Sequence, residues 1–269
     1  MERWIAETIE SVISQEGDFE IEYIIVDGGS SDKTSEIIRD FQSRLDRGDI
    51  RARCRSFSLK YIQQKTKGMY GAINEGFTVA TGDIYAWIGG DDVYRPHTAL
   101  AGIANWFSKH SDSLWVKGIC GFIDSDGRVI REGVYKSYNQ KWLQKGIYGR
   151  ETYFVEQEST FWCAELWKKV APIPVEFRSA GDYWLNIQFA HHAPLESIKI
   201  QTTYFRTRPD QISARSDVYR KEQAIIMPNR DWVAVRVRLY SIVTNTVRPP
   251  RWICVILFRA LFPFEQYNF

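Results

Sequence analysis

The amino-acid sequence predicts an α/β fold in which a mostly parallel sheet is flanked by helices on both faces. Short apolar runs typical of buried strands alternate with longer segments of helical periodicity, and two of those runs end in glycine and aspartate. The composition is that of a globular chain with a core, with 44% hydrophobic and 25% charged residues over 269 positions. This length accommodates one large domain or two small ones.

The expected elements follow one another over the first 110 residues. Trp4, Ile9 and Val12 belong to one apolar stripe at helical spacing, so residues 3–15 are expected to be a helix. The same periodicities predict strands at 21–26, near 51–63 and at 83–89, and helices at 33–44, 68–81 and 97–109. Because the first element is a helix, the strand that would precede it, the first and central one, is expected to be missing, which would leave an unpaired edge or a gap beside residues 21–26.

The stretch "YIIVDGGSSDKT" places Asp27 at the carboxyl end of a buried strand. Gly28 and Gly29 follow it, and glycine allows both positive φ and close approach of a ligand. Ser30 begins a group of residues that cap the following helix. One alternative is a ligand site, because open α/β sheets bind ligands at this end. The other is an ordinary Asx or glycine turn.

A second strand end, "WIGGDDVY", carries the adjacent carboxylates Asp91 and Asp92. Two carboxylates at a buried strand end are costly unless positive charge lies beside them. A divalent cation that carries a diphosphate is one solution, since Mg²⁺ and Mn²⁺ prefer oxygen ligands. The alternative is a solvated Asp-Asp turn. Because two strand ends of one chain combine glycine with aspartate, we favour a shared site for a nucleotide and a metal.

Basic residues concentrate near the C-terminus. Residues 206–269 carry 11 basic and 5 acidic side chains, although the whole chain has a net charge of only +2. This distribution indicates an anionic surface as partner and makes no case for nucleic acid. Within this region, residues 248–264 combine three arginines with aromatic and aliphatic residues. They are too few to span a bilayer, so they form either a helix packed on the domain or a segment in an anionic headgroup layer.

The four cysteines are far apart, which argues against a zinc site and favours a reducing compartment. The first 15 residues, "MERWIAETIESVISQ", lack the basic and apolar regions of a signal peptide. We therefore expect a cytoplasmic protein, with peripheral contact on the inner face of the cell membrane as a further expectation.

Five motifs in order give the chain a resemblance to a known family. They are "IIVDGGSSDKT", "KGMYGAINEGFTVATGDIYAWIGGDDVYRP", "EQESTFW", "SAGDYWL" and "FRTRPDQIS". Together they resemble the motifs of family 2 glycosyltransferases with the GT-A fold, and the resemblance covers roughly residues 1–215. It implies a GT-A-like domain at 1–215, followed by a basic, apolar helical extension at 216–269.

The resemblance also implies roles for individual residues. Asp182 is the expected general base, and its alternative role is that of a helix N-cap. Mg²⁺ or Mn²⁺ is expected on Asp92 and Asp91, with Arg206 or Arg208 adding positive charge near the donor phosphates. Nucleotide contacts are expected from Asp27, Gly28, Gly29, Ser30, Lys67, Asp91 and Arg206, and acceptor-side positions at Gln157 and Trp162.

The expected function is transfer of a sugar, with inversion, from a nucleotide-sugar donor to a glycan or lipid-linked acceptor in polysaccharide synthesis. Two alternatives stay open. One is an impaired relative that binds nucleotide-sugar or glycan without turnover. The other is a structural partner of an active transferase that uses the basic tail.

Overall fold

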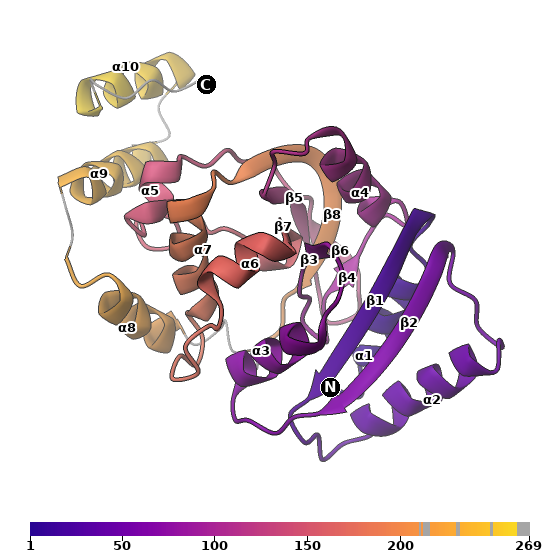
Figure 1. Cartoon of the computed structure of the whole chain (residues 1–269). Helices are drawn as coiled ribbons and strands as arrows, with labels where there is room; N and C mark the ends of the chain where they lie inside the picture. Colours follow the sequence, from indigo (N-terminus) through magenta and orange to yellow (C-terminus); the bar gives the residue numbers. More distant parts are fainter. Residues whose placement is uncertain (210, 212–215, 230–231, 248–249, 263–269) are drawn as a thin grey trace.

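The computed structural model describes residues 1–209, 211, 216–229, 232–247 and 250–262. Helices surround two sheets (Figure 1). The helices are α1 (Ile5–Ile13), α2 (Thr34–Asp46), α3 (Met69–Val79), α4 (Ala99–Lys109), α5 (Gln140–Gln144), α6 (Ala164–Val170), α7 (Gly181–His192), α8 (Ser216–Ile226), α9 (Trp232–Val247) and α10 (Arg251–Leu261), with a 3-10 helix, η1, at Gln157–Ser159. The strands are β1 (Gly17–Asp27), β2 (Cys54–Gln63), β3 (Ile84–Tyr85), β4 (Val93–Tyr94), β5 (Trp115–Ile123), β6 (Val129–Arg131), β7 (Thr160–Cys163) and β8 (Glu196–Arg206).

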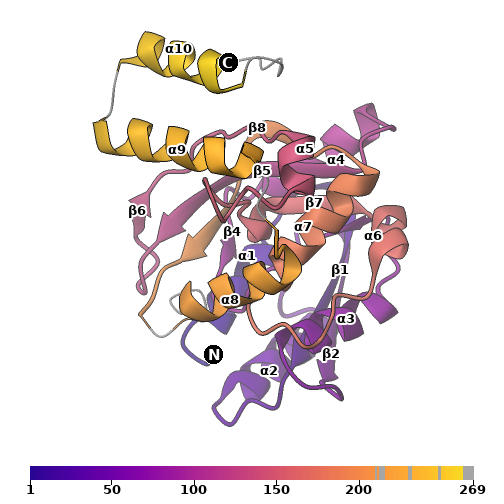
Figure 2. The same ribbon diagram turned by 90° about the vertical axis from the view of Figure 1, so that its left-hand side faces the viewer.

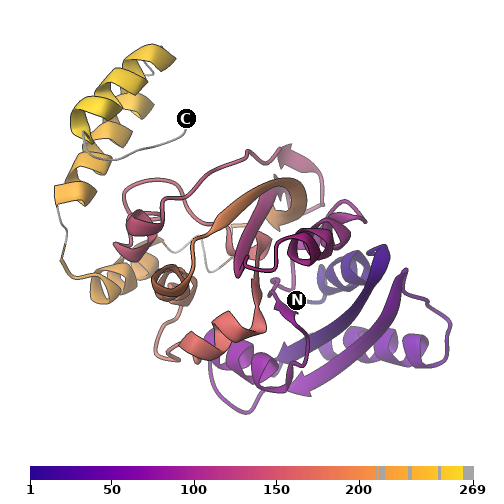
Figure 3. The ribbon, with the colours of Figure 1, turned by 45° about the horizontal axis from the view of Figure 1, so that its top comes forward.

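The smaller sheet consists of β1 and β2, which pair in parallel. Apolar side chains of α1 and α2 pack against this sheet around Ile9, Ile38 and Leu59, so the stripe predicted for the first helix is buried as expected. No described strand pairs with the other edge of β1. The expectation of an unpaired edge beside residues 21–26 is thus confirmed, and Figure 3 shows the β1–β2 pair set apart from the other strands.

The larger sheet has the order β3-β7-β5-β8-β4, with β6 paired to β5. Only β5 and β8 pair in parallel there, and the other four pairs are antiparallel. The α/β class is confirmed, but the sheet is mixed and not mostly parallel. The expectation rested on the alternating rhythm of the first 110 residues, whereas β5 and β6 form a hairpin around the turn at 124–128.

The predicted helices and strands of the first 110 residues are all present, with boundaries shifted by a few residues. The largest difference concerns the strand expected at 83–89. Only Ile84 and Tyr85 form a ladder, through antiparallel pairing with β7. The apolar residues that follow still pack inward, but they have no described strand beside them to extend the ladder. These residues therefore pack inward without being part of a strand. The apolar pattern of the sequence predicts that packing but not the hydrogen-bonded pairing.

The C-terminal helices pack on the main body through aromatic side chains. The ring centroids of Phe258 in α10 and of Phe262, its C-cap residue, lie 6.3 and 5.3 Å from that of Trp142 in α5. Figure 2 shows α9 and α10 running along the periphery, with α8 leading to them from the body. No helix in the described part of the chain is long and apolar enough to cross a bilayer.

Candidate active site

Asp27 ends β1 and is almost fully buried, and its carboxylate is held by four hydrogen bonds. Oδ1 accepts from the amide (3.1 Å) and hydroxyl (2.6 Å) of Ser30. Oδ2 accepts from the Ser35 hydroxyl (2.8 Å) and from the Tyr61 hydroxyl (3.0 Å). Burial alone would raise the pKa of Asp27, but these hydrogen bonds lower it below its usual value. The carboxylate is therefore ionised and fixed in one orientation.

The glycines after Asp27 shape an open loop. Gly29 has φ +89°, a left-handed value that favours glycine, and nothing lies within 4 Å of where a Cβ would stand. The Gln64 amide donates to the Asp27 carbonyl (2.9 Å), which brings the loop before α3 to the same end of the small sheet. Lys67 is exposed on that loop. The expected nucleotide-side residues thus lie at one edge.

Asp91 and Asp92 lie in the turn that precedes β4, and their carboxylates converge on Gly89. A Cβ on Gly89 would stand 3.1 Å from Asp91 Oδ1 and 2.8 Å from Asp92 Oδ2. The two oxygens are therefore at most 5.9 Å apart (2.8 + 3.1 Å), and a Cβ at Gly89 would collide with Asp92 Oδ2 and crowd Asp91 Oδ1. The other Asp92 oxygen, Oδ1, accepts from the Arg206 amide at 2.8 Å.

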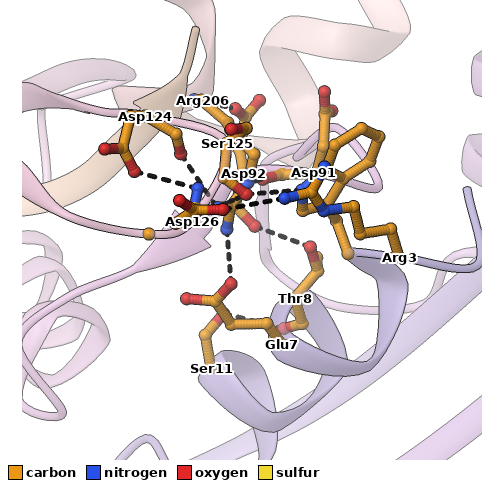
Figure 4. A network of polar contacts seen from close by, with 12 residues as sticks. Arg3, Glu7, Thr8, Ser11, Asp91, Asp92, Asp124, Ser125, Asp126 and Arg206 are labelled. Carbon is orange, nitrogen blue, oxygen red and sulfur yellow. Dashed lines mark hydrogen bonds and ion pairs between the residues drawn. The ribbon is translucent and has the colours of Figure 1, made fainter. Parts of the chain in front are cut away.

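Arg206, at the end of β8, is fully buried, and its guanidinium binds the protein itself (Figure 4). Nε donates to the Asp91 carbonyl at 2.6 Å, and Nη1 donates to the Asp124 carbonyl at 3.1 Å. Nη2 forms an ion pair with Glu7 of α1 at 2.5 Å. These contacts clamp α1, the Asp-Asp turn and the 124–128 turn together. The expected role of Arg206 at donor phosphates does not fit this geometry, because its donors are already used.

Arg208 is the arginine that reaches the carboxylate pair. Its Nε donates to Asp91 Oδ2 at 2.7 Å, and its guanidinium carbon lies 4.9 Å from the centroid of the Trp4 ring. Both members of the ion pair are mostly buried, which strengthens their attraction. In the rest of the "FRTRPDQIS" motif, Asp210, Ile212 and Ser213 lie outside the described residues.

The carboxylate pair has the donor set of a Mg²⁺ or Mn²⁺ site that a ligand completes. Burial first, and then repulsion from Glu158 and Asp91, raise the pKa of Asp92 well above its usual value. A cation at the converging oxygens would relieve this cost. Among the described residues, no cluster of three or more His, Cys, Asp or Glu side chains could hold a metal alone. Magnesium sites commonly combine one or two carboxylates with phosphate oxygens and water, so the pair fits such an ion.

Asp182 lies in the first turn of α7, with its backbone and side chain contacted from two other helices. Its amide donates to the Tyr70 hydroxyl of α3 (3.3 Å), and the Tyr219 hydroxyl of α8 donates to Oδ2 (3.4 Å). Oδ1 is buried and has no hydrogen-bond partner among the residues that the structure describes. Burial raises the pKa of Asp182 to about 6. The N-cap of α7 is Ala180, so the alternative prediction that Asp182 is the N-cap residue is wrong.

Glu222 of α8 holds the backbone that leads into α7. Its carboxylate accepts from the amides of Arg178 (2.7 Å), Ser179 (3.0 Å) and Ala180 (2.8 Å). A carboxylate at a helix N-terminus is stabilised by these amides and by the helix dipole. Helix α8 therefore fixes the position of Asp182 twice, through the backbone before it and through Tyr219.

Glu158 is a third buried acid within electrostatic range of both Asp92 and Asp182, and the sequence motifs did not indicate it. It lies in η1, is buried, and has a pKa raised to about 7, by burial first and also by repulsion from Glu156 and Asp182. Since Glu158 in turn raises the pKa of Asp92, it lies within electrostatic range of both Asp92 and Asp182. The signal that could have found it is the pair of acids just before a buried strand in "EQESTFW".

The two residues expected at the acceptor side differ in position. Gln157 is half-buried in η1, and its Nε2 donates to the Trp87 carbonyl at 3.0 Å. Trp162 is a core residue with 1% of its surface exposed, and it packs edge-on against Trp87 with 5.6 Å between ring centroids. Trp162 is therefore not placed to contact an acceptor. The sequence around Trp162 does not alternate between apolar and polar residues, so it did not indicate whether the Trp162 side chain faces the core or the site.

Comparison with known proteins identifies relatives of the chain. The sequence profile "Glycosyl transferase family 2" matches residues 2–160. An uncharacterised glycosyltransferase, alr2836, of Nostoc sp. is 27% identical over 86% of this chain and 70% of its own length. A PGL/p-HBAD biosynthesis glycosyltransferase of Mycobacterium bovis is 26% identical over 64% of this chain and 58% of its own length.

Solved structures share the fold. S. aureus TarS 1–349, in complex with UDP-GlcNAc, superposes with a TM-score of 0.62 at 17% identity, over 90% of this chain and 70% of that one. The chain spans 41% of a longer TarS structure. The mannosyltransferase PcManGT from Pyrobaculum calidifontis, in complex with GDP-Man and Mn²⁺, gives a TM-score of 0.54 at 15% identity, over 96% of this chain and 65% of that one. The fold is GT-A-like, and because the family profile covers more than half of its residues, the chain belongs to glycosyl transferase family 2.

Proposed function

We propose that this chain transfers a sugar from a nucleotide-sugar to a hydroxyl group of a glycan or lipid-linked acceptor, with inversion at the anomeric carbon. One observation carries the proposal. Asp92, Glu158 and Asp182 come from three distant parts of the sequence, and they interact electrostatically in one buried region. Burial of several carboxylates together is costly, and it is typical of sites that bind cations or transfer protons.

The donor side is assigned to the two strand ends. Asp27, the Gly28–Ser30 loop and Lys67 would face the nucleotide, and Asp91 and Asp92 would hold Mg²⁺ or Mn²⁺. When bound, such an ion supplies positive charge that stabilises the departing diphosphate. Arg208 lies on Asp91 and adds a second positive group, so it takes the role expected for Arg206. The ligands of TarS and PcManGT, UDP-GlcNAc and GDP-Man with Mn²⁺, support a nucleotide-sugar and a divalent metal.

The acceptor side is assigned to Asp182. Within the described part of the chain its Oδ1 has no hydrogen-bond partner, so this oxygen is the one assigned to accept the proton of the attacking hydroxyl. A pKa of about 6 leaves the carboxylate ionised at neutral pH, and makes it more basic than an exposed aspartate. Tyr219 and Glu222 hold the carboxylate and the preceding backbone, so the base has a fixed orientation.

The alternatives are a relative that binds nucleotide-sugar or glycan without turnover and a structural partner of an active transferase. They separate experimentally, since turnover of a donor excludes both and binding without turnover selects the first.

Thermal unfolding in the presence of nucleoside diphosphates tests the donor side. A ligand that binds the native state raises Tm, because it increases the free energy of unfolding, by about 2.7 kcal/mol when the ligand is at 100 times its Kd. We expect one nucleoside diphosphate to raise Tm with Mn²⁺ and to do so much less with EDTA. If no nucleoside diphosphate raises Tm under either condition, the donor site is misassigned.

The pH dependence of turnover tests the base. Because the base must be ionised, kcat should fall on the acid side with an apparent pKa of about 6. The Tyr219 hydroxyl donates to the ionised carboxylate and lowers its pKa, so Tyr219→Phe should move the acid limb of the profile to higher pH.

Tyr183→Phe is the matched control for that measurement. Tyr183 is buried next to Asp182 on α7, and its hydroxyl donates to the Gly146 carbonyl at 2.6 Å instead of to Asp182. This variant should lose stability without moving the pH profile. An acid limb that is the same in wild type and Tyr219→Phe would show that Tyr219 does not act on the base.

A further inference from the structure

Helix α9 has two apolar faces, although it lies at the periphery of the molecule. One face is buried through Ala234 and Val237. The opposite face exposes a stripe at helical spacing, in which Trp232 is 78% exposed and both Leu239 and Ile242 are 51% exposed. A surface helix normally carries polar residues there. We call this the α9 stripe, and its members are Trp232, Val235, Leu239, Ile242 and Val243.

The charge around the α9 stripe has one sign. Residues 232–262 contain five arginines and no aspartate or glutamate. Arg236 and Arg238 belong to α9 itself and are exposed. Their positions in the sequence place them on opposite flanks of the stripe, since each residue advances about 100° around a helix. An apolar stripe bordered by arginines is the pattern of a helix that lies in a lipid headgroup layer.

The structure shifts the membrane expectation from the segment 248–264 to α9. Phe258 of α10 and the C-cap residue Phe262 are buried against α5, which agrees with the packing alternative for that segment. Arg248 and Phe264 lie outside the described residues. The exposed large apolar side chains are instead mainly on the preceding helix, α9, which runs between α10 and the main body at the periphery (Figure 2).

We propose that the α9 stripe is a membrane-docking surface that inserts into the interfacial layer of an anionic bilayer. Trp232, Leu239 and Ile242 would enter the boundary between headgroups and acyl chains, while Arg236 and Arg238 would stay at the phosphate level. A second copy of the chain fits this surface less well. A two-fold contact through the stripe would bring the arginines of both copies together with no acid on α9 or α10 to pair with them.

Sedimentation with vesicles tests this surface on the full chain. Wild type should bind vesicles of phosphatidylcholine mixed with phosphatidylglycerol, bind phosphatidylcholine alone much less, and bind more weakly as salt rises. The double variant Leu239→Gln, Ile242→Gln should reduce the partition coefficient by about tenfold or more, since two apolar side chains lose their burial in lipid. Arg238→Gln should weaken the salt dependence.

The matched control is Ile130→Gln, Val134→Gln. These side chains are 56% and 68% exposed at and just after β6, far from α9 in the sequence, and their replacement should leave vesicle binding unchanged. If the double variant unfolds, Trp232→Ser takes its place.

Equal binding by wild type and the α9 variant overturns the proposal, as does equal binding to neutral and anionic vesicles. A dimer that the α9 variant dissolves, with no vesicle binding by wild type, would assign the stripe to a second copy and also overturns it. Nucleotide-dependent Tm shifts are read separately, so failure here does not affect the proposed transferase site.

Discussion

Asp182→Asn should lower kcat for sugar transfer by about 10²- to 10⁴-fold, the usual scale for loss of a general base. Asparagine keeps the size and the hydrogen-bonding oxygen of the side chain, so the contact with Tyr219 is retained while the proton acceptor is lost. Donor affinity should change little, because the donor is assigned to the two strand ends. Nucleoside diphosphate release measures kcat, and calorimetric titration measures donor affinity.

Asp217→Asn is the control for this substitution. Asp217 is exposed in the first turn of α8, so the same chemical change is made near the site without touching it. A collapse of donor affinity in Asp182→Asn would make Asp182 a binding residue. Retained activity in Asp182→Asn would show that Asp182 is not the general base.

Asp92→Asn should reduce nucleoside diphosphate affinity in Mn²⁺ to the level measured in EDTA, which we expect to be a loss of about 100-fold or ~2.8 kcal/mol. The fold should survive, because the asparagine carbonyl can still accept from the Arg206 amide. Removal of a buried charge also relieves repulsion with Glu158 and Asp91. Titration of nucleotide with and without metal measures the effect.

Asp124→Asn separates a direct role of Asp92 from a general disturbance of the clamp. Asp124 belongs to the network around Arg206 through its backbone carbonyl, but its half-buried side chain accepts from the amides of Asp126 and Arg128. Its replacement should leave metal-dependent binding intact. If Asp92→Asn binds as wild type does and still requires metal, Asp92 is not a ligand.

The sequence predicted well those features that depend on short-range patterns. Polar groups were expected at two strand ends that carry glycine and aspartate, and the structure shows two carboxylates near Gly89 and a hydrogen-bonded Asp27 in an open glycine loop, while their sharing of one ligand stays a prediction. The unpaired edge of β1 was expected as well. These features depend on residues that are adjacent in the sequence, so periodicity and turn chemistry are enough to find them.

The features that the sequence did not predict depend on contacts between distant segments. Arg206 is the last residue of β8, and Arg208 lies two residues beyond it. Their different partners depend on tertiary packing: Arg206 binds Glu7 and backbone carbonyls, whereas Arg208 binds the Asp91 carboxylate. Glu158 gains its importance from burial near Asp92 and Asp182. Trp162 looks like an aromatic acceptor contact in the sequence, yet it lies in the core.

The most direct test of the central claim is nucleoside diphosphate release from a panel of nucleotide-sugars with Mn²⁺ and candidate acceptors, measured for wild type and Asp182→Asn in parallel. We predict that at least one donor that raises Tm is turned over by wild type, and that Asp182→Asn turns it over about 10²- to 10⁴-fold more slowly. The contrary result is a donor that binds with Mn²⁺ but yields nucleoside diphosphate no faster with wild type than with Asp182→Asn. It would contradict the assignment and identify a protein that binds nucleotide-sugar without transferring it.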